Sequence, residues 1–213
     1  MKSLIVFILS LIVGVVLVAG YAYLNHQYAV ALVSNPTITT KFSLSNAPTD
    51  SLKGEIASMS GTVTWLSRVA KKPVLLIAKQ SIQQGEELGT GKNGNAAVTI
   101  QNTVAVILSA NSLVNFIQML PVNTVIAQDK GSVRYENVGG NALTVNTLDL
   151  ITAINRSWAN ISVDPVAKTV TVTVQKGSVT VGYEDLQNNS NVVTVAAGKQ
   201  FIFDDSTRIG TTE

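Results

Sequence analysis

Short runs of alternating apolar and polar residues fill the sequence from residue 54 to residue 203. In residues 169–174, three valines at 170, 172 and 174 alternate with three threonines. Successive side chains of a β-strand point to opposite faces, so this pattern predicts a strand with one buried and one wet face. No helical periodicity of useful length interrupts the series. The region therefore predicts one all-β domain. The other predicted strands are 61–65, 96–100, 104–108, 113–117, 132–137, 142–146, 158–163, 178–183, 191–195 and 200–203.

A weak internal repeat runs through this region. The tetrapeptide KGSV occupies 130–133 and recurs at 176–179, and the GTV of 61–63 has the same shape. We interpret each copy as a hairpin in which the glycine supplies the turn conformation. Stacked hairpins would give an antiparallel β-roll or sandwich with few free edges.

An uncharged N-terminal stretch indicates a membrane anchor. Residues 4–24 carry no charge, and 21 residues of helix span about 30 Å, which crosses a bilayer. Lys2 precedes the stretch, and the next charge is Lys41, so we expect a cytoplasmic N-terminus and an extracytoplasmic bulk, in the periplasm or on the cell surface. The alternative is a cleaved signal peptide, with a passable cleavage site at 20–22.

Four segments follow from these features. Residues 1–33 are predicted to form the transmembrane helix and a short extension, which Pro36 stops. Residues 34–53 form a stalk, residues 54–203 the β-domain, and residues 204–213 a C-terminal tail.

Composition excludes several classes of function. The chain has no cysteine and one histidine, so it has no disulfide, no thiolate nucleophile and no Cys- or His-rich zinc site. Its net charge is only +2, which argues against nucleic acid as a partner.

The acidic residues are not arranged for catalysis. The adjacent pairs are 86–87, 184–185 and 204–205, and neighbouring residues of a strand point to opposite faces. We interpret the pairs as solvated turn charges. The single His26 lies beside the apolar stretch, away from any serine and aspartate partner of the β-domain. We therefore expect no enzymatic activity, no metal and no cofactor.

The segment 81–113, SIQQGEELGTGKNGNAAVTIQNTVAVILSANSL, resembles the FecR-type periplasmic domain. It has a Gly-acid pair, a Thr-Gly, an alternating strand, a turn, a second strand and then Asn-Ser-x-Leu. The segments KGSVRY at 130–135, VTVTVQKGSVTV at 170–181 and AGKQF at 197–201 are similar to the later part of that family. The resemblance covers roughly 54–203. It implies the fold and a membrane-anchored outer location.

Two turns depart from the family pattern. Residues 101–103 read Gln-Asn-Thr instead of Asp-Gly-Ser, which a turn tolerates because Asn accepts positive φ. Residues 156–158 read Arg-Ser-Trp instead of Arg-Gly-Thr, so we expect local divergence there. Only three residues precede the apolar stretch and ten follow Phe203, so the family's anti-sigma and receptor-contacting segments are not expected, and the resemblance does not carry over sigma-factor regulation.

Arg156 is the candidate site residue. One interpretation, which we favour, is a buried guanidinium that satisfies loop carbonyls; the other is a ligand-binding arginine beside the Trp158 indole. The glycine-rich segment 91–95 lacks the spacing of a phosphate loop and is predicted to be a turn. The glycines expected to form structural turns are Gly85, Gly91, Gly131, Gly177 and Gly198.

The sequence predicts a binding or scaffolding module in envelope assembly or signalling, anchored to the membrane and acting on an extracytoplasmic protein partner. One alternative is a pilin-like filament subunit, although no acid precedes Asp50 as the processing site of a pilin would require. Another is a surface polysaccharide-binding module, although its aromatic residues are few and scattered.

Overall fold

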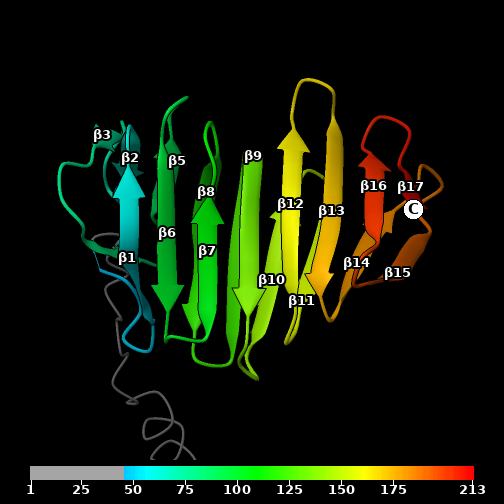
Figure 1. The fold of residues 1–213 in the computed structure, drawn as a ribbon, viewed down its shortest axis with the longest axis horizontal. Coiled ribbons are helices and arrows are strands. Elements are labelled where there is room, and N and C mark those ends of the chain that lie inside the picture. The colour runs from blue at the N-terminus through cyan, green and yellow to red at the C-terminus, as the bar shows by residue number, and fades with distance from the viewer. Residues whose placement is uncertain (1–45) are drawn as a thin grey trace, which may run out of the picture. The chain divides into compact units, whose positions relative to one another are not determined.

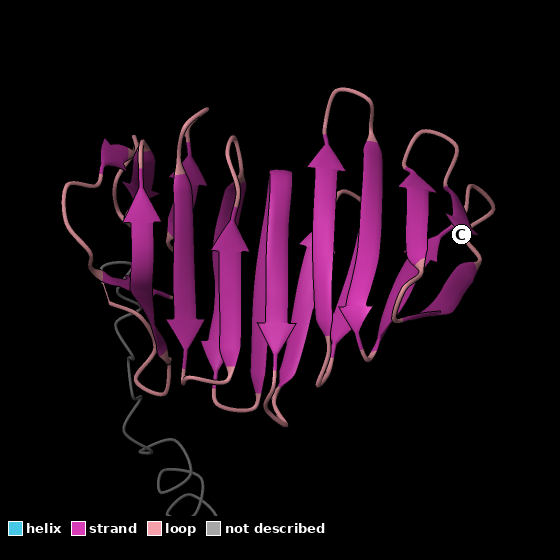
Figure 2. Cartoon of the chain, in the orientation of Figure 1, coloured by secondary structure: helices cyan, strands magenta, loops and turns pink. Residues whose placement is uncertain are grey.

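The computed structural model describes residues 46–213, and every helix or strand assigned in this part is a β-strand (Figure 2). The all-β prediction is therefore confirmed for the described part. The predicted transmembrane helix at 1–33 lies outside the described residues. Among residues 46–213 there is no helix with the length and hydropathy needed to span a bilayer.

The strands follow the alternating runs closely, with several additions that the runs did not predict. In chain order they are β1 Lys53–Ser60, β2 Val63–Leu66, β3 Val74–Leu75, β4 Ser81–Gln83, β5 Glu87–Thr90, β6 Asn95–Ile100, β7 Val104–Leu108, β8 Leu113–Leu120, β9 Asn123–Asn137, β10 Ala142–Thr147, β11 Leu150–Ile154, β12 Trp158–Asp164, β13 Thr169–Lys176, β14 Ser178–Glu184, β15 Ser190–Ala196, β16 Gln200–Asp204 and β17 Ile209–Thr212.

The strands form two stacked layers, which Figure 1 shows one behind the other. The front sheet has the order β4-β1-β6-β7-β9-β12-β13-β16-β17. The rear sheet has the order β3-β2-β5-β8-β9-β10-β11-β14-β15. Strand β9 belongs to both, because its first part pairs in the rear sheet and its second part in the front sheet. The pairing of β9 with β10 is parallel, so the arrangement is mixed and not wholly antiparallel as expected.

The core lies between the two layers. Val170, Val172 and Val174 of β13 are buried, whereas the threonines between them are half-buried, which confirms the face predicted for this strand. Phe201 and Phe203 of β16 fill the same layer. Removing a side chain of this kind from water contributes about 1.5–3 kcal/mol, so the inward-facing row of each strand holds the layers together.

The repeated glycines mark places where the chain changes sheet. Gly61 lies between β1 of the front sheet and β2 of the rear sheet, Gly131 lies where β9 passes from rear to front, and Gly177 lies between β13 and β14. All three have positive φ. The hairpin interpretation of these copies was wrong. A crossing and a hairpin turn both need a left-handed glycine followed by inward valines, so the pattern alone did not distinguish them.

Close contacts explain why these crossings need glycine. A Cβ on Gly131 would lie 2.5 Å from the Cα of Ser112 and 2.7 Å from the carbonyl oxygen of Asn111. A Cβ on Gly177 would lie 2.9 Å from the Cβ of Ser157 and 3.1 Å from the carbonyl oxygen of Arg156. Each glycine crossing is thus packed against a second crossing of the chain.

The other three glycines expected in turns differ from one another. Gly85 and Gly198 have positive φ, and nothing lies within 4 Å of a Cβ built on Gly198. Gly91 does not have positive φ, but its Cβ would come within 3.0 Å of the Cβ of Thr62. Close packing, not turn conformation, is therefore what favours glycine at 91.

Residues 204–213, expected as a tail, continue the front sheet. After a turn, β17 pairs antiparallel with β16, from Asp204 opposite Ile209 to Phe201 opposite Thr212. The turn is stabilised by Asp204, whose Oδ1 accepts hydrogen bonds from the N–H groups of Ser206 and Thr207.

Replacing Gly131 by alanine should destabilise the domain more than replacing Gly198. Both residues have positive φ, which costs an alanine about 1–2 kcal/mol, but only at Gly131 would the new Cβ overlap backbone atoms. We expect a loss of about 2–4 kcal/mol for Gly131→Ala and about 1 kcal/mol for Gly198→Ala, measured by urea unfolding. Equal losses would show that the crossing at 131 can relax.

Candidate functional site

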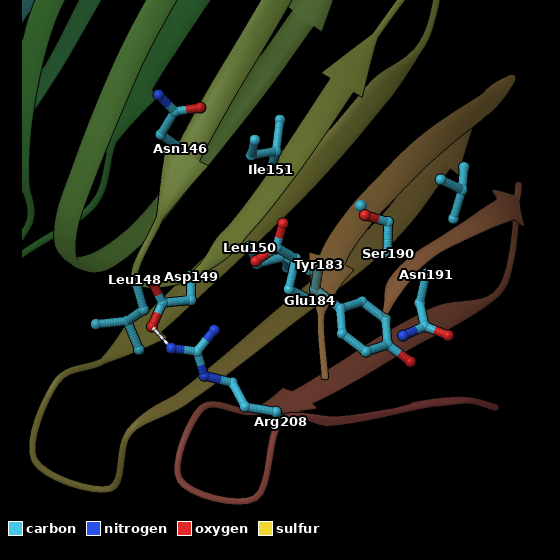
Figure 3. A pocket seen from close by; sticks show the side chains of 12 residues that line it. Asn146, Leu148, Asp149, Leu150, Ile151, Tyr183, Glu184, Ser190, Asn191 and Arg208 are labelled. Carbon is cyan, nitrogen blue, oxygen red and sulfur yellow. Dashed lines mark ion pairs between the residues drawn. The ribbon is translucent and has the colours of Figure 1, made fainter. Parts of the chain in front are cut away.

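A hollow of about 500 Å³ opens on the rear sheet near the C-terminal end of the domain (Figure 3). Strand register places Ile151 of β11 beside Gly182 of β14, and Gly182 beside Val192 of β15. Ile151 and Val192 are 54% and 72% exposed, so this row lies on the outer face of the sheet. Gly182 forms the floor between two apolar walls.

Neither backbone conformation nor packing requires glycine at position 182. The residue does not have positive φ, and a Cβ built on it would meet only the carbonyl oxygen of Asn191, at 3.8 Å. A glycine inside a strand weakens that strand, and it often marks a place where another molecule approaches closely. The missing side chain is what leaves the hollow open.

An ion pair forms one rim of the hollow. Asp149, in the turn between β10 and β11, pairs with Arg208, in the turn between β16 and β17, as the dashed line in Figure 3 shows. The ring of Tyr183 lies beside them and packs on Phe201 and Phe203, with ring centroids 5.9 and 5.0 Å apart. A rear-sheet turn and a front-sheet turn thus meet at this rim.

A second hollow of about 370 Å³ is lined by some of the same residues. It shares Tyr183, Asn191 and Arg208 with the first. Its lining adds Leu186 and Ile209, two further exposed apolar side chains. Exposed apolar side chains therefore continue from the sheet face around the C-terminal end of the domain.

The carboxyl group of Asp205, in the turn between β16 and β17, has a raised pKa and a buried oxygen atom. Its Oδ1 atom is buried without a hydrogen-bond partner. Burial raises the pKa of Asp205, the neighbouring carboxyl group of Asp149 raises it further, and Arg208 partly lowers it. A single arginine thus faces two carboxyl groups.

The predicted site residue Arg156 is exposed, so the interpretation as a buried guanidinium was wrong. The residue has φ 49° at the crossing between β11 and β12, where it supplies the carbonyl that faces Gly177. Asn111, with φ 56°, occupies the matching position opposite Gly131. Arg156 thus contributes its backbone to the crossing, and the residue is exposed.

Trp158 is half-buried at the start of β12, and the cation over its ring is Lys176, with Nζ 4.9 Å from the ring centroid. In the ligand-binding interpretation, Arg156 would lie beside the Trp158 indole. In the structure, Lys176 occupies the position over that ring.

The predicted acid pairs have mainly structural roles. Glu86 is buried, not solvated as expected, and it accepts hydrogen bonds from the Trp65 indole at 3.0 Å and the Gln83 N–H at 2.8 Å. Asp185 caps its turn by accepting hydrogen bonds from the N–H groups of Asn189 and Gln187, which lower the pKa of its carboxyl group. Residues 46–213 hold no group of three or more histidine or acidic side chains placed to bind a metal.

Sequence reasoning missed the residues of the hollow. The available signal was Gly182, which takes an outward position in the run SVTVGY at 178–183, where Thr180 precedes it on the same face. Ile151 lies in β11, whose strand-like sequence LITAI does not alternate between apolar and polar residues. Its approach to Val192 depends on the order of β11, β14 and β15, which the sequence did not reveal.

Two crystal structures, at 1.65 and 2.50 Å resolution, of a protein assigned as an anti-sigma factor from Parabacteroides distasonis ATCC 8503 share this fold. Each has 15% sequence identity to this chain and a TM-score of 0.52, with 60% of this chain and 58% of that chain covered. No protein-family model matches the sequence, and no curated protein matches it. The likeness establishes the fold alone, over little more than half of the neighbour's length, and it is consistent with the FecR-type resemblance.

Substitution of Arg156 should affect stability through its backbone conformation. Arg156→Ala should leave the melting temperature nearly unchanged, because the side chain is exposed and alanine adopts φ 49° no more easily. Arg156→Asn should raise the unfolding free energy by up to about 1 kcal/mol, because Asn tolerates this conformation. A large loss in the alanine variant, measured by thermal melting, would mean that the guanidinium is needed for the fold.

The raised pKa of Asp205 predicts a pH-dependent stability. Above the ordinary value of 3.8 the folded protein binds more protons than the unfolded chain, so stability falls as the pH rises from 3.8 through the raised pKa. Asp205→Asn should remove this loss and melt at a higher temperature than the parent protein at neutral pH. The two should converge below pH 3.8.

Asp204→Ala provides the matched control, because it removes a turn cap from the adjacent residue and should lower the melting temperature at neutral pH. If Asp205→Asn were also less stable there, the Asp205 carboxylate would be a favourable partner of Arg208 and not a strained neighbour of Asp149.

Proposed function

We propose that this chain is a membrane-anchored protein whose β-domain binds a protein partner outside the cytoplasm, in signalling or envelope assembly. The open hollow over Gly182 is the observation that carries the proposal. A residue with a side chain stabilises a strand better than glycine does. Gly182 nevertheless occupies the position between two exposed apolar neighbours, Ile151 and Val192.

The chemistry of the hollow suits a protein segment. Its floor and walls are apolar, and its rim offers the Asp149–Arg208 pair, Asn191 and Glu184 for hydrogen bonds. Binding sites of this kind bury an apolar side chain at the centre and fix its orientation with polar groups at the rim. Contiguous exposed apolar residues on a folded domain also mark interaction surfaces.

The proposed extracytoplasmic location and the proposed role in signalling are supported by other features. The uncharged stretch at 4–24 supports an anchor with the β-domain outside. The fold that the domain shares with an anti-sigma factor supports a role in signalling rather than in a filament. We propose no direct contact with a sigma factor, because the shared fold lies in the β-domain, which we propose to be outside the cytoplasm.

The alternatives have less support. A polysaccharide would need a free aromatic face, and Tyr183, the aromatic residue at the hollow, packs its ring on Phe201 and Phe203. We propose binding without catalysis, because Asp149 is paired with Arg208 and the Asp205 carboxyl group is tied to the same cluster.

Photo-crosslinking in the native membrane tests this proposal. A photoreactive amino acid at Ile151 should crosslink the full-length protein to a discrete partner in the membrane fraction. Gly182→Leu should reduce that product at least tenfold while leaving the melting temperature within a few degrees, because the new side chain would fill open space.

A photoreactive residue at Val166, which is 93% exposed in the turn between β12 and β13, is the matched control and should not yield the product. The same product from both positions, or a product that survives Gly182→Leu, would refute the hollow as the binding site.

A further inference from the structure

We infer that β15 is a self-association strand, through which two copies of this chain form an antiparallel dimer with its twofold axis at Val193. This inference goes beyond the proposed function, because it concerns a sheet edge and a second copy, not the hollow and a different protein.

The four sheet edges are unequal. The edges at β3, β4 and β17 have two, three and four residues, whereas β15 has seven. Within the described residues, β15 pairs only with β14. Its sequence, SNVVTVA, has no charge and no proline, the two features that normally protect an edge from pairing with another chain.

The hydrogen-bond pattern shows which backbone groups of β15 are available. The Ala197 N–H donates to the Gly177 carbonyl, and the Asp185 N–H donates to the Asn189 carbonyl. In an antiparallel ladder the paired residues alternate, so the odd-numbered residues of β15 bond to β14. Val192 and Thr194 therefore direct their N–H and C=O groups away from the sheet.

These free groups define the register of the dimer. When Val192 of each copy pairs with Thr194 of the other, about four new backbone hydrogen bonds form and Val193 lies opposite its own counterpart. Val193 is half-buried and packs against the edge of the core. A second Val193 on the axis would complete its burial, and each rear sheet would continue into that of the other copy.

Charge complementarity selects a second copy in the antiparallel direction. Glu184 and Asp185 lie where the turn before β15 begins, and Lys199 lies in the turn that follows β15. Antiparallel pairing brings Lys199 of each copy toward the acidic turn of the other, whereas parallel pairing would align like charges. Asp185 stays ionised because its turn hydrogen bonds lower its pKa. Such complementarity fixes the direction of association.

A cysteine scan tests the register directly, because the chain has no native cysteine. Residues directly opposite in a non-hydrogen-bonded antiparallel pair have Cα atoms about 4.5 Å apart, within the range of a disulfide. Under mild oxidation, full-length Val193→Cys in detergent micelles should form a covalent dimer. Val192→Cys, which faces Thr194 of the second copy, should form it at least tenfold more slowly.

Two further variants test the edge and the charges by sedimentation of the full-length protein. Val192→Pro removes an outward N–H and should yield monomer, while Thr212→Pro, at an outward position of the other edge strand β17, should leave the dimer intact. Lys199→Glu should weaken the dimer at least tenfold, and the double variant Lys199→Glu/Glu184→Lys should restore it.

A protein that is monomeric at tens of micromolar would overturn the inference, as would a dimer lost in Thr212→Pro but kept in Val192→Pro. Equal crosslinking from positions 192 and 193 would overturn the register. A different protein crosslinked at β15 in place of a second copy would also overturn it. Because Ile151 lies two strands from this edge, the crosslinking test of the hollow can succeed or fail independently.

Discussion

The rest of the structure depends on the close contact between paired crossings of the chain. Where the chain passes from one sheet to the other, a left-handed glycine lies against the backbone of a second crossing, as Gly131 does against Asn111 and Gly177 against Arg156. These contacts leave no room for a Cβ, so they set how closely adjacent hairpins stack. At this separation of the layers, the inward rows of valine and phenylalanine fill the space between them.

The sequence predicted most strands because alternation reports directly which residues face the core. Residues 104–108 and 169–174 are strands in the structure, and the valines of 169–174 face inward as predicted. Alternation does not report which sheet a strand joins, so the repeated glycines were interpreted as hairpin turns. The interpretation of Arg156 was wrong for a related reason, because a sequence does not show which residues adopt positive φ. Arg156 has this backbone conformation and is exposed, whereas the sequence favoured a buried guanidinium.

The hollow was beyond prediction because four strands, β10, β11, β14 and β15, and two turns build it. Gly182 could have been noticed as a break in an outward row, but its meaning depends on Ile151 and Val192, which register brings to either side. The free edge β15 adjoins this row, and Val192 belongs to both surfaces. The two proposed interactions would thus use neighbouring faces of the same end of the domain, with the Asp149–Arg208 pair and Asp205 beside them.

The shared strand β9 also has a consequence for the order of folding. Most pairings join strands that are neighbours in the chain or separated by one hairpin, and such local contacts form quickly. Among the strands that the structure describes, only β9 ties the two layers together within one continuous strand, and its parallel partner β10 begins the second half of the domain. A nucleus around β9 could extend toward both ends, one hairpin at a time. The strands at both ends of the domain would then form last and open first in the native protein, which places the hollow and the free edge in a weakly protected part of the sandwich for hydrogen exchange.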